Sequence, residues 1–412
     1  MIEPAQEKDH LEDLAVLGGP PLFEKTLHVG GPNVVNRTAL FARFNEMLDR
    51  NWLTNNGPLV QEFERRVAEF TGVRHCVAIC NATVALEIAC RALDLEGEVI
   101  LPSFTFIATA HALQWQGIQP VFCDIETDTH CIDPAEVERH ITPRTTGIIG
   151  VNVWGQTCQT EALQEIADRN HLQLLFDSAH AFAVSRNGRM VGSFGRCEVF
   201  SFHATKFINS FEGGAVLTND DELAEKMRLM RNFGFSKIDE VIYIGTNGKM
   251  TEVCAAMGLT NLDSCEDFLK TNLTNYHGYR GAFRSIPGIR LLEYNDGESC
   301  NYQYIVTEVG PEFGLTRDQL MTILHAENIR ARRYFWPGCH RMEPYKSFFP
   351  HANLLLPTTE SIAEKVLLYP TGISLGVDDV TTIGRLIRFL SRNADAISSR
   401  LRSIEKNEPE DG

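Results

Sequence analysis

Between Cys76 and Leu217 the chain alternates short apolar runs with amphipathic stretches, and this alternation restricts the possible folds more than any other feature. Apolar runs of about four to eight residues bounded by turn residues are typical of buried strands. Strands that alternate with helices form βαβ units, which build a mainly parallel sheet covered on both faces. We therefore predict an α/β domain with strands at residues 75–79, 98–101, 120–123, 147–151, 172–176, 197–202 and 214–217, and with helices at 83–92, 105–115, 134–140 and 160–170 between them.

The remaining parts of the chain predict an arm, a second domain and a tail. Residues 1–30 contain Gly18-Gly19-Pro20-Pro21, which breaks regular structure, so we expect a mobile or surface-lying N-terminal arm. Residues 31–250 form the large domain, with two further helices at 37–49 and 60–70. Residues 251–402 begin with a linking helix and then mix strands (301–306, 365–369) with helices (316–327, 377–391), which is typical of a smaller α+β domain. The charged tail 403–412 is expected to fray.

Charge and composition argue against several classes of protein. The formal net charge is −16, so nucleic acid and anionic membranes would repel the chain and neither is expected as a partner. The first residues, MIEPAQEKDHLEDL, lack the apolar core of a signal peptide, so none is expected, and no uncharged apolar run reaches the roughly 18 residues of a membrane span. The 11 cysteines form no C-x-x-C pair, and the histidines lack metal-ligand spacing. These features predict a cytoplasmic protein with reduced thiols and no metal.

The most informative segment is CEVFSFHATKFINSFEGG, in which an apolar strand runs into a polar loop that carries Lys206. A lysine held just beyond a buried strand can be partly desolvated, which lowers its pKa from about 10.4 and makes its amine a usable nucleophile. Taken alone, Lys206 is better explained as an ordinary solvated lysine, because most lysines are solvated.

A second segment lies 29 residues upstream, where the strand LLFD delivers Asp177 at its carboxyl end. Ligands of parallel sheets bind beyond the carboxyl ends of the strands, so Asp177 should face a site. Pyridoxal phosphate requires an acid beside its pyridine nitrogen, which must stay protonated for the ring to withdraw electrons. The alternative for Asp177 is a helix or turn cap.

Two further segments are weaker signals. In CNATVAL a strand is followed directly by a helix, so the backbone amides of Ala82 and Thr83 are free to bind an anion. An ordinary helix cap is the alternative. In PSFTFIAT the ring of Phe106 could stack on a flat ligand or simply join the core.

With these segments in view, the chain resembles the DegT/StrS family of sugar aminotransferases, which have fold type I of the pyridoxal-phosphate enzymes. The resemblance runs from about Pro32 to the last helices through the segments WLTNNGPLVQEFE, CNATVAL, PSFTFIATAHA, NVWGQ, FDSAHAF, SFHATK, EGG and GTNGKMTEVCAAMGL. It implies pyridoxal 5'-phosphate as cofactor, Lys206 as Schiff-base lysine, and Asp177 as the partner of the pyridine nitrogen.

The same resemblance implies the other contacts of the site. Phe106 would stack on the cofactor ring, and His180, where the family often has Gln, would lie near its phenolic oxygen. The phosphate would be bound by Ala82, Thr83 and Ser201, and by Asn247 of a neighbouring subunit, so a homodimer with shared active sites is expected. Asn56 and Lys249 are expected to contact the substrate.

The resemblance also implies the reaction. A ping-pong aminotransferase would move an amino group from an amino acid, by analogy glutamate, to a keto-sugar, for which a nucleotide-linked 4-keto-6-deoxyhexose is the first expectation. A cyclitol aminotransferase and a non-catalytic regulator with the same fold are the alternatives. A sugar dehydratase of the family is disfavoured, because those enzymes replace the lysine with histidine and this chain keeps Lys206.

Overall fold

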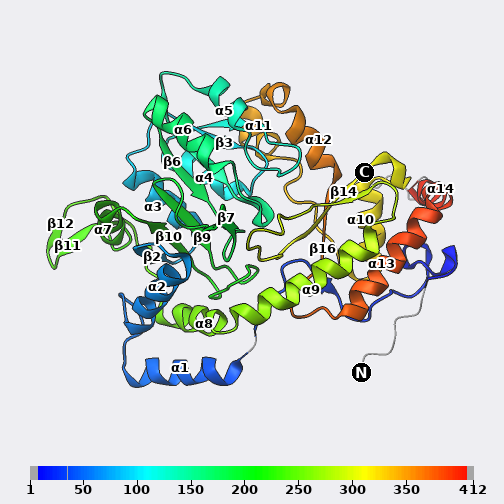
Figure 1. The fold of residues 1–412 in the computed structure, drawn as a ribbon, viewed down its shortest axis with the longest axis horizontal. Helices are drawn as coiled ribbons and strands as arrows, with labels where there is room; N and C mark the ends of the chain where they lie inside the picture. Colours follow the sequence, from blue (N-terminus) through cyan, green and yellow to red (C-terminus); the bar gives the residue numbers. More distant parts are fainter. Residues whose placement is uncertain (1–7, 35, 406–412) are drawn as a thin grey trace, which may run out of the picture.

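The computed structural model describes residues 8–34 and 36–405 of the chain. Its centre is a seven-stranded sheet with the order β2-β10-β9-β6-β5-β3-β4 (Figure 1). The strands are β2 (His75–Ile79), β3 (Glu98–Pro102), β4 (Gln119–Cys123), β5 (Thr145–Val151), β6 (Gln173–Asp177), β9 (Cys197–Ser201) and β10 (Gly214–Thr218). All neighbours are parallel except β10, which runs antiparallel to both β2 and β9. The prediction of a mainly parallel seven-stranded α/β sheet is confirmed.

The helices around this sheet come before, between and after its strands, and their apolar stripes match its continuous apolar strands. Helix α3 packs against α4, α7 and the strands β9 and β10, while α2 packs against β2 and α8. These helices are α1 (Arg37–Asp49), α2 (Pro58–Thr71), α3 (Ala82–Ala92), α4 (Ile107–Gln114), α5 (Pro134–His140), α6 (Thr160–Asn170), α7 (Asp221–Met230) and α8 (Glu252–Leu262). Two short hairpins, β7–β8 (Ser185–Arg186 and Arg189–Met190) and β11–β12 (Phe235–Lys237 and Glu240–Val241), complete this part. In Figure 1 the hairpin β11–β12 projects from the side of the molecule.

The long helix α9 (Cys265–Phe283) leads from the large sheet to a second group of elements (Figure 1). The sequence predicted one helix over residues 251–268, whereas the structure has two, α8 and α9, which meet at Asp263–Ser264. The second group contains β13 (Ile289–Leu291), β14 (Ile305–Val309), α10 (Arg317–Ala326), β15 (Ile329–Arg330), β16 (Val366–Tyr369), α13 (Val377–Arg392) and α14 (Ala394–Glu405). The helices α11 (Tyr345–Phe348) and α12 (Pro357–Lys365) instead pack against the core of the large sheet.

In the small sheet β13-β14-β16, the strands β14 and β16 are buried on both faces, whereas β13 is partly exposed. Side chains alternate along a strand, and here they divide between two cores. Val306 and Leu368 pack into the core of the large sheet, whereas Ile305 and Tyr369 pack into a second core with α9, α10 and α13.

Residues 1–7 of the predicted N-terminal arm lie outside the described residues, and residues 8–30 differ from the expected mobile or surface-lying segment. Leu14 and Leu22 are buried in the second core, and β1 (Leu27–His28) pairs with β15. The carboxylate of Glu327 accepts hydrogen bonds from the amides of Ala15 (2.8 Å) and Leu22 (2.7 Å). The described part of the arm is therefore fixed by burial and by the carboxylate of Glu327. The amides that Glu327 binds lie 305 and 312 residues away in sequence, so no local pattern could reveal this contact.

Two further sequence expectations concern the ends of the chain and membranes. Residues 406–412 of the predicted frayed tail lie outside the described residues, and residues 403–405 belong to α14. No helix in the described part of the chain is both long and apolar enough to span a membrane.

Candidate active site

A cavity of about 490 Å³ opens at the carboxyl ends of the parallel strands. The topology explains its position, because β6 and β9 are neighbouring parallel strands and therefore end on the same edge of the sheet. Of the residues predicted from the sequence, the structure brings these seven to the cavity wall: Ala82, Thr83, Phe106, Asp177, His180, Ser201 and Lys206.

Lys206 lies in the loop between β9 and β10, where its amide donates to the carbonyl of His203 (2.8 Å) in a tight turn. Burial lowers the pKa of its amine to about 8, and the negative charge of Asp177 partly opposes that shift. Roughly a tenth of the amine is therefore neutral at pH 7, far more than for an ordinary lysine, as a nucleophile and proton carrier requires.

Asp177 is buried at the end of β6 and is held by two donors. The hydroxyl of Thr109 donates to Oδ2 (2.8 Å) and the amide of Ala179 donates to Oδ1 (3.2 Å). Burial raises the pKa of the carboxyl, while these hydrogen bonds and the positive charge of Lys206 act in the opposite direction. A carboxylate in such surroundings is stabilised further by a cationic partner in the cavity.

The N-terminus of α3 forms the third part of the site. Asn81 caps the helix by accepting from the amide of Val84 (2.9 Å), so the amides of Ala82 and Thr83 have no acceptor within the helix. A Cβ on Gly214 would lie 2.6 Å from the nitrogen of Ala82, so only glycine allows β10 to pass this close. Free amides and the helix dipole make this corner of the cavity an anion site.

The wall around His180 is aromatic. Its ring packs against Trp154 (5.7 Å between centroids), Tyr304 (4.5 Å) and Phe335 (5.9 Å). Burial, followed by the positive charge of Lys206, holds the pKa of His180 well below its ordinary value, so its imidazole is neutral.

Sequence reasoning missed the wall that comes from the second half of the chain. Tyr304, Arg332, Tyr334 and Phe335 line the cavity, as does Gly30 of the N-terminal arm. The run RARRYFW at residues 330–336 combines cationic and aromatic side chains, and that composition is the one local signal that could have singled it out.

The structure does not bring Asn56, Asn247 and Lys249 to the cavity of their own chain. Asn56 accepts a hydrogen bond from Arg231 (3.1 Å), and Lys249 donates to Asn232 (3.0 Å). Asn247 is exposed.

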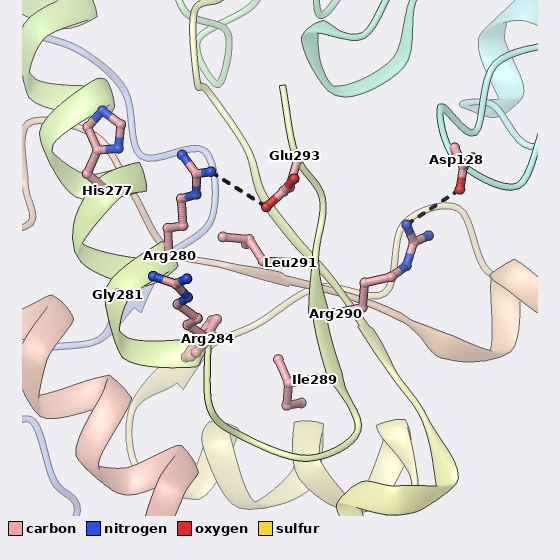
Figure 2. Close-up of a pocket in the computed structure, with 10 residues that line it drawn as sticks. Asp128, His277, Arg280, Gly281, Arg284, Ile289, Arg290, Leu291 and Glu293 are labelled. Carbon is pink, nitrogen blue, oxygen red and sulfur yellow. Dashed lines mark ion pairs between the residues drawn. The ribbon is translucent and has the colours of Figure 1, made fainter. Parts of the chain in front are cut away.

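A surface groove of about 870 Å³ lies between α9 and β13 (Figure 2). Its wall carries His277 and Arg280 on α9 and Arg284 just after that helix, with Arg290 opposite them. Arg280 pairs with Glu293 (3.8 Å) and Arg290 with Asp128 (3.8 Å). This groove lacks the combination of lysine, buried carboxylate and free helix amides, so the chemistry belongs to the first cavity.

The first cavity fits pyridoxal phosphate part by part. An amine of lowered pKa suits the aldehyde, a buried carboxylate suits the ring nitrogen, and a helix N-terminus suits the phosphate. The ring of Phe106 is 60% exposed and available to pack on a flat ligand. Among residues 8–34 and 36–405, no group of three or more His, Cys, Asp or Glu side chains could hold a metal ion.

Comparisons with known proteins agree with this geometry. The sequence profile of the DegT/DnrJ/EryC1/StrS aminotransferase family matches residues 36–388. The chain is 36% identical over 366 residues to dTDP-4-amino-4,6-dideoxy-D-glucose transaminase of Shigella dysenteriae, covering 89% of this chain and 99% of that protein. It is 31% identical over 318 residues to GDP-perosamine synthase of Vibrio cholerae, covering 75% and 86%. The crystal structure of DesI in the presence of its TDP-sugar product matches with a TM-score of 0.92 at 45% identity, covering 95% of this chain and 100% of that one.

Proposed function

Since the chain belongs to the DegT/DnrJ/EryC1/StrS aminotransferase family and is a pyridoxal-phosphate-dependent aminotransferase of nucleotide sugars, we propose that it aminates C4 of a dTDP-linked 4-keto-6-deoxyhexose. The amino donor in this proposal is L-glutamate, and the two half-reactions follow each other in a ping-pong sequence. The observation that carries the proposal is the placement of Lys206, Asp177 and the α3 N-terminus around one cavity. The substrate class is supported by the names of the relatives, which act on or hold dTDP-, TDP- and GDP-linked sugars.

Each part of the cavity has a defined task in this reaction. When bound, the cofactor supplies an aldehyde for the amine and a ring that withdraws electrons from the adjacent carbon. Asp177 holds a proton at the ring nitrogen, and the amides of Ala82 and Thr83 bind the phosphate. The Nζ of Lys206 anchors the cofactor, accepts a proton from the Cα of the donor and later delivers a proton to C4 of the sugar.

The proposal is tested by the product. Purified protein, L-glutamate and dTDP-4-keto-6-deoxyglucose should give a dTDP-4-amino-4,6-dideoxyhexose, identified by mass spectrometry and NMR. The Lys206→Ala variant is the matched control and should form none while remaining folded by circular dichroism. If a GDP-linked keto-sugar or a keto-cyclitol is aminated instead and the dTDP-sugar is not, the substrate assignment is wrong although the enzyme class stands.

The position of Asn247 supports the further proposal that the enzyme is a homodimer with shared sites. Asn247 lies outside the cavity of its own chain and follows the hairpin β11–β12, near which Ile238, Ile242 and Ile244 are exposed. Exposed apolar side chains gathered on a projecting hairpin are typical of a protein–protein contact. Asn247 would donate to the phosphate bound by the other chain.

Subunit exchange tests this sharing. Lys206→Ala and Asn247→Asp chains should each be inactive alone, because one lacks the amine and the other places a negative charge beside the phosphate. A mixed dimer has one site with both changes and one with neither, so part of the activity should return on mixing. An inactive Asn247→Asp variant that shows no recovery after proven exchange contradicts sharing, and a fully active variant shows that Asn247 has no essential role.

A further inference from the structure

Trp154 follows Val153, which lines the cavity, and has an unusual backbone conformation. It lies with φ 64° and ψ 2° in the left-handed region, although it is bulky and fully buried. For a residue of this size such a conformation is a true outlier, and it persists only where the surroundings fix it. Strained residues of this kind gather at functional sites.

The strained backbone directs the amide of Trp154 toward His180. The amide nitrogen donates to Nδ1 of His180 over 3.4 Å. A backbone amide can only donate, so Nδ1 of His180 must be the unprotonated nitrogen. In a neutral imidazole the proton then sits on Nε2, the nitrogen that remains for a ligand in the cavity.

A buried hydrogen-bonded chain holds the indole of Trp154 in place. Its Nε1–H donates to Nδ1 of His130 (3.3 Å), and Nε2 of His130 donates to Glu308 (3.0 Å). Glu308 also pairs with Arg290, which reaches the surface groove of Figure 2. Burial raises the pKa of the Glu308 carboxyl, but the hydrogen bonds from His130 and Arg290 outweigh it and hold that pKa below its ordinary value.

Further contacts leave the indole little freedom. Its ring stacks on Phe335 (5.1 Å, 14° between planes) and on His180, and the carbonyl of Trp154 accepts from the hydroxyl of Tyr294 (3.0 Å). The ring, the carbonyl and the indole nitrogen are thus all fixed, which forces the amide into its unusual direction.

We propose that His130 and Trp154 are positioning residues that fix the tautomer of His180, so that His180 presents Nε2–H as a hydrogen-bond donor to the bound cofactor. The acceptor is the phenolic oxygen next to the aldehyde, where a donor stabilises negative charge. The groups that face His180 are Lys206, Trp154, Tyr304 and Phe335, and among the described residues Trp154 is the one whose donor reaches Nδ1. The inference rests on the cofactor site of the proposed function, but not on the identity of the sugar.

The first test needs neither cofactor nor turnover. In apoprotein labelled with ¹⁵N-histidine, the signal of His180, assigned by its loss in His180→Gln, should show an unprotonated Nδ1 and a protonated Nε2. The opposite tautomer in the wild-type protein overturns the proposal. Because this measurement uses apoprotein, its failure is distinguishable from a wrong substrate assignment.

The second test uses the visible absorbance of the bound cofactor. The absorbance of the bound cofactor changes with pH, and the midpoint of that change is the quantity measured. His130→Leu removes both hydrogen bonds of the imidazole and should raise this midpoint by about 0.5 to 1 pH unit, which corresponds to one lost neutral hydrogen bond. His130→Gln can accept from the indole and donate to Glu308, so it should restore the wild-type midpoint. If His130→Gln shifts the midpoint as far as His130→Leu, the hydrogen bonds are not responsible and the proposal is wrong.

Two further variants separate positioning from stability. His340 is an equally buried histidine that pairs with Glu360 (2.5 Å) and Ser103 (2.7 Å) and does not line the cavity, so His340→Leu should lower the thermal stability without moving the midpoint. Trp154→Phe keeps an aromatic ring but lacks the indole N–H, and it should shift the midpoint in the same direction as His130→Leu even if the latter folds poorly. An unchanged midpoint in Trp154→Phe, or an equal shift in His340→Leu, contradicts the proposal.

Discussion

The hydroxyl of Thr109 should set the pH range over which the enzyme works. It donates to Oδ2 of Asp177 over 2.8 Å inside the protein, where both groups are buried. Thr109→Val keeps the shape of the side chain and removes this donor, together with the hydrogen bond between the hydroxyls of Thr109 and Thr105 (2.9 Å). A hydrogen bond to a charged group contributes about 1.5–3 kcal/mol, and one pKa unit corresponds to about 1.36 kcal/mol. The pKa of Asp177, already raised by burial, should therefore rise by about 1–2 further units.

The assay is the pH dependence of kcat/KM for the keto-sugar at a saturating concentration of the amino donor, measured from about pH 5 to about pH 9. Only ionised Asp177 can hold the ring nitrogen protonated, so the acid limb of the profile should move up by about 1–2 pH units. Thr307→Val is the matched control, since Thr307 is fully buried and its hydroxyl donates to the carbonyl of Leu367 (3.2 Å) away from the cavity. An acid limb that stays in its wild-type position in Thr109→Val, or that moves equally in Thr307→Val, refutes the reasoning.

Three other outcomes are expected. The apoprotein should take up the cofactor faster as the pH rises, with a midpoint near the pKa of about 8 for Lys206, as followed by absorbance. Asp177→Asn should lower that midpoint, because the aspartate charge raises the lysine pKa. Phe106→Ala should weaken cofactor binding about ten- to hundredfold, the value of burying one aromatic ring, as measured by equilibrium dialysis. Glu327→Gln leaves the buried amine of Lys8 (3.1 Å) without its charge partner, so thermal unfolding should occur at lower temperature, with a loss of about 3–5 kcal/mol, and protease should cut the N-terminal arm first.

The sheet and several residues of the cavity wall could be predicted because their signals are local. Each strand of the large sheet is a short apolar run, and burial on both faces makes such runs easy to recognise. Asp177 and Lys206 follow the ends of two of these runs, so the topology of a parallel sheet alone places them near each other. The family resemblance then supplied roles that the pattern could not.

Other features depend on contacts between distant segments and were not predictable in this way. The antiparallel direction of β10 depends on its pairing with both β2 and β9. An apolar run in the sequence does not indicate in which direction the strand will lie in the sheet. The left-handed conformation of Trp154 is forced by His130, Tyr294 and Phe335, none of which is its neighbour in sequence. The expected strand at 301–306 begins only at Ile305, because Asn301 instead donates to the carbonyls of His180 and Phe182 (both 2.9 Å).

One wall of the cavity is formed by the segment that contains Arg332 and Phe335. The small sheet supports this segment, and residues of that sheet pack into both cores. Arg332 pairs with Leu368 of β16 through two backbone hydrogen bonds (3.1 and 2.7 Å), and the next residues of that segment include Phe335, which lines the cavity. Leu368 itself packs into the core of the large sheet, whereas its neighbour Tyr369 packs into the second core. A displacement of either core would therefore move Arg332 and Phe335 relative to Lys206. Because this wall is formed by segments that meet only through the tertiary fold, it can differ between relatives that keep the same lysine and aspartate, and differences in the accepted sugar should be sought there.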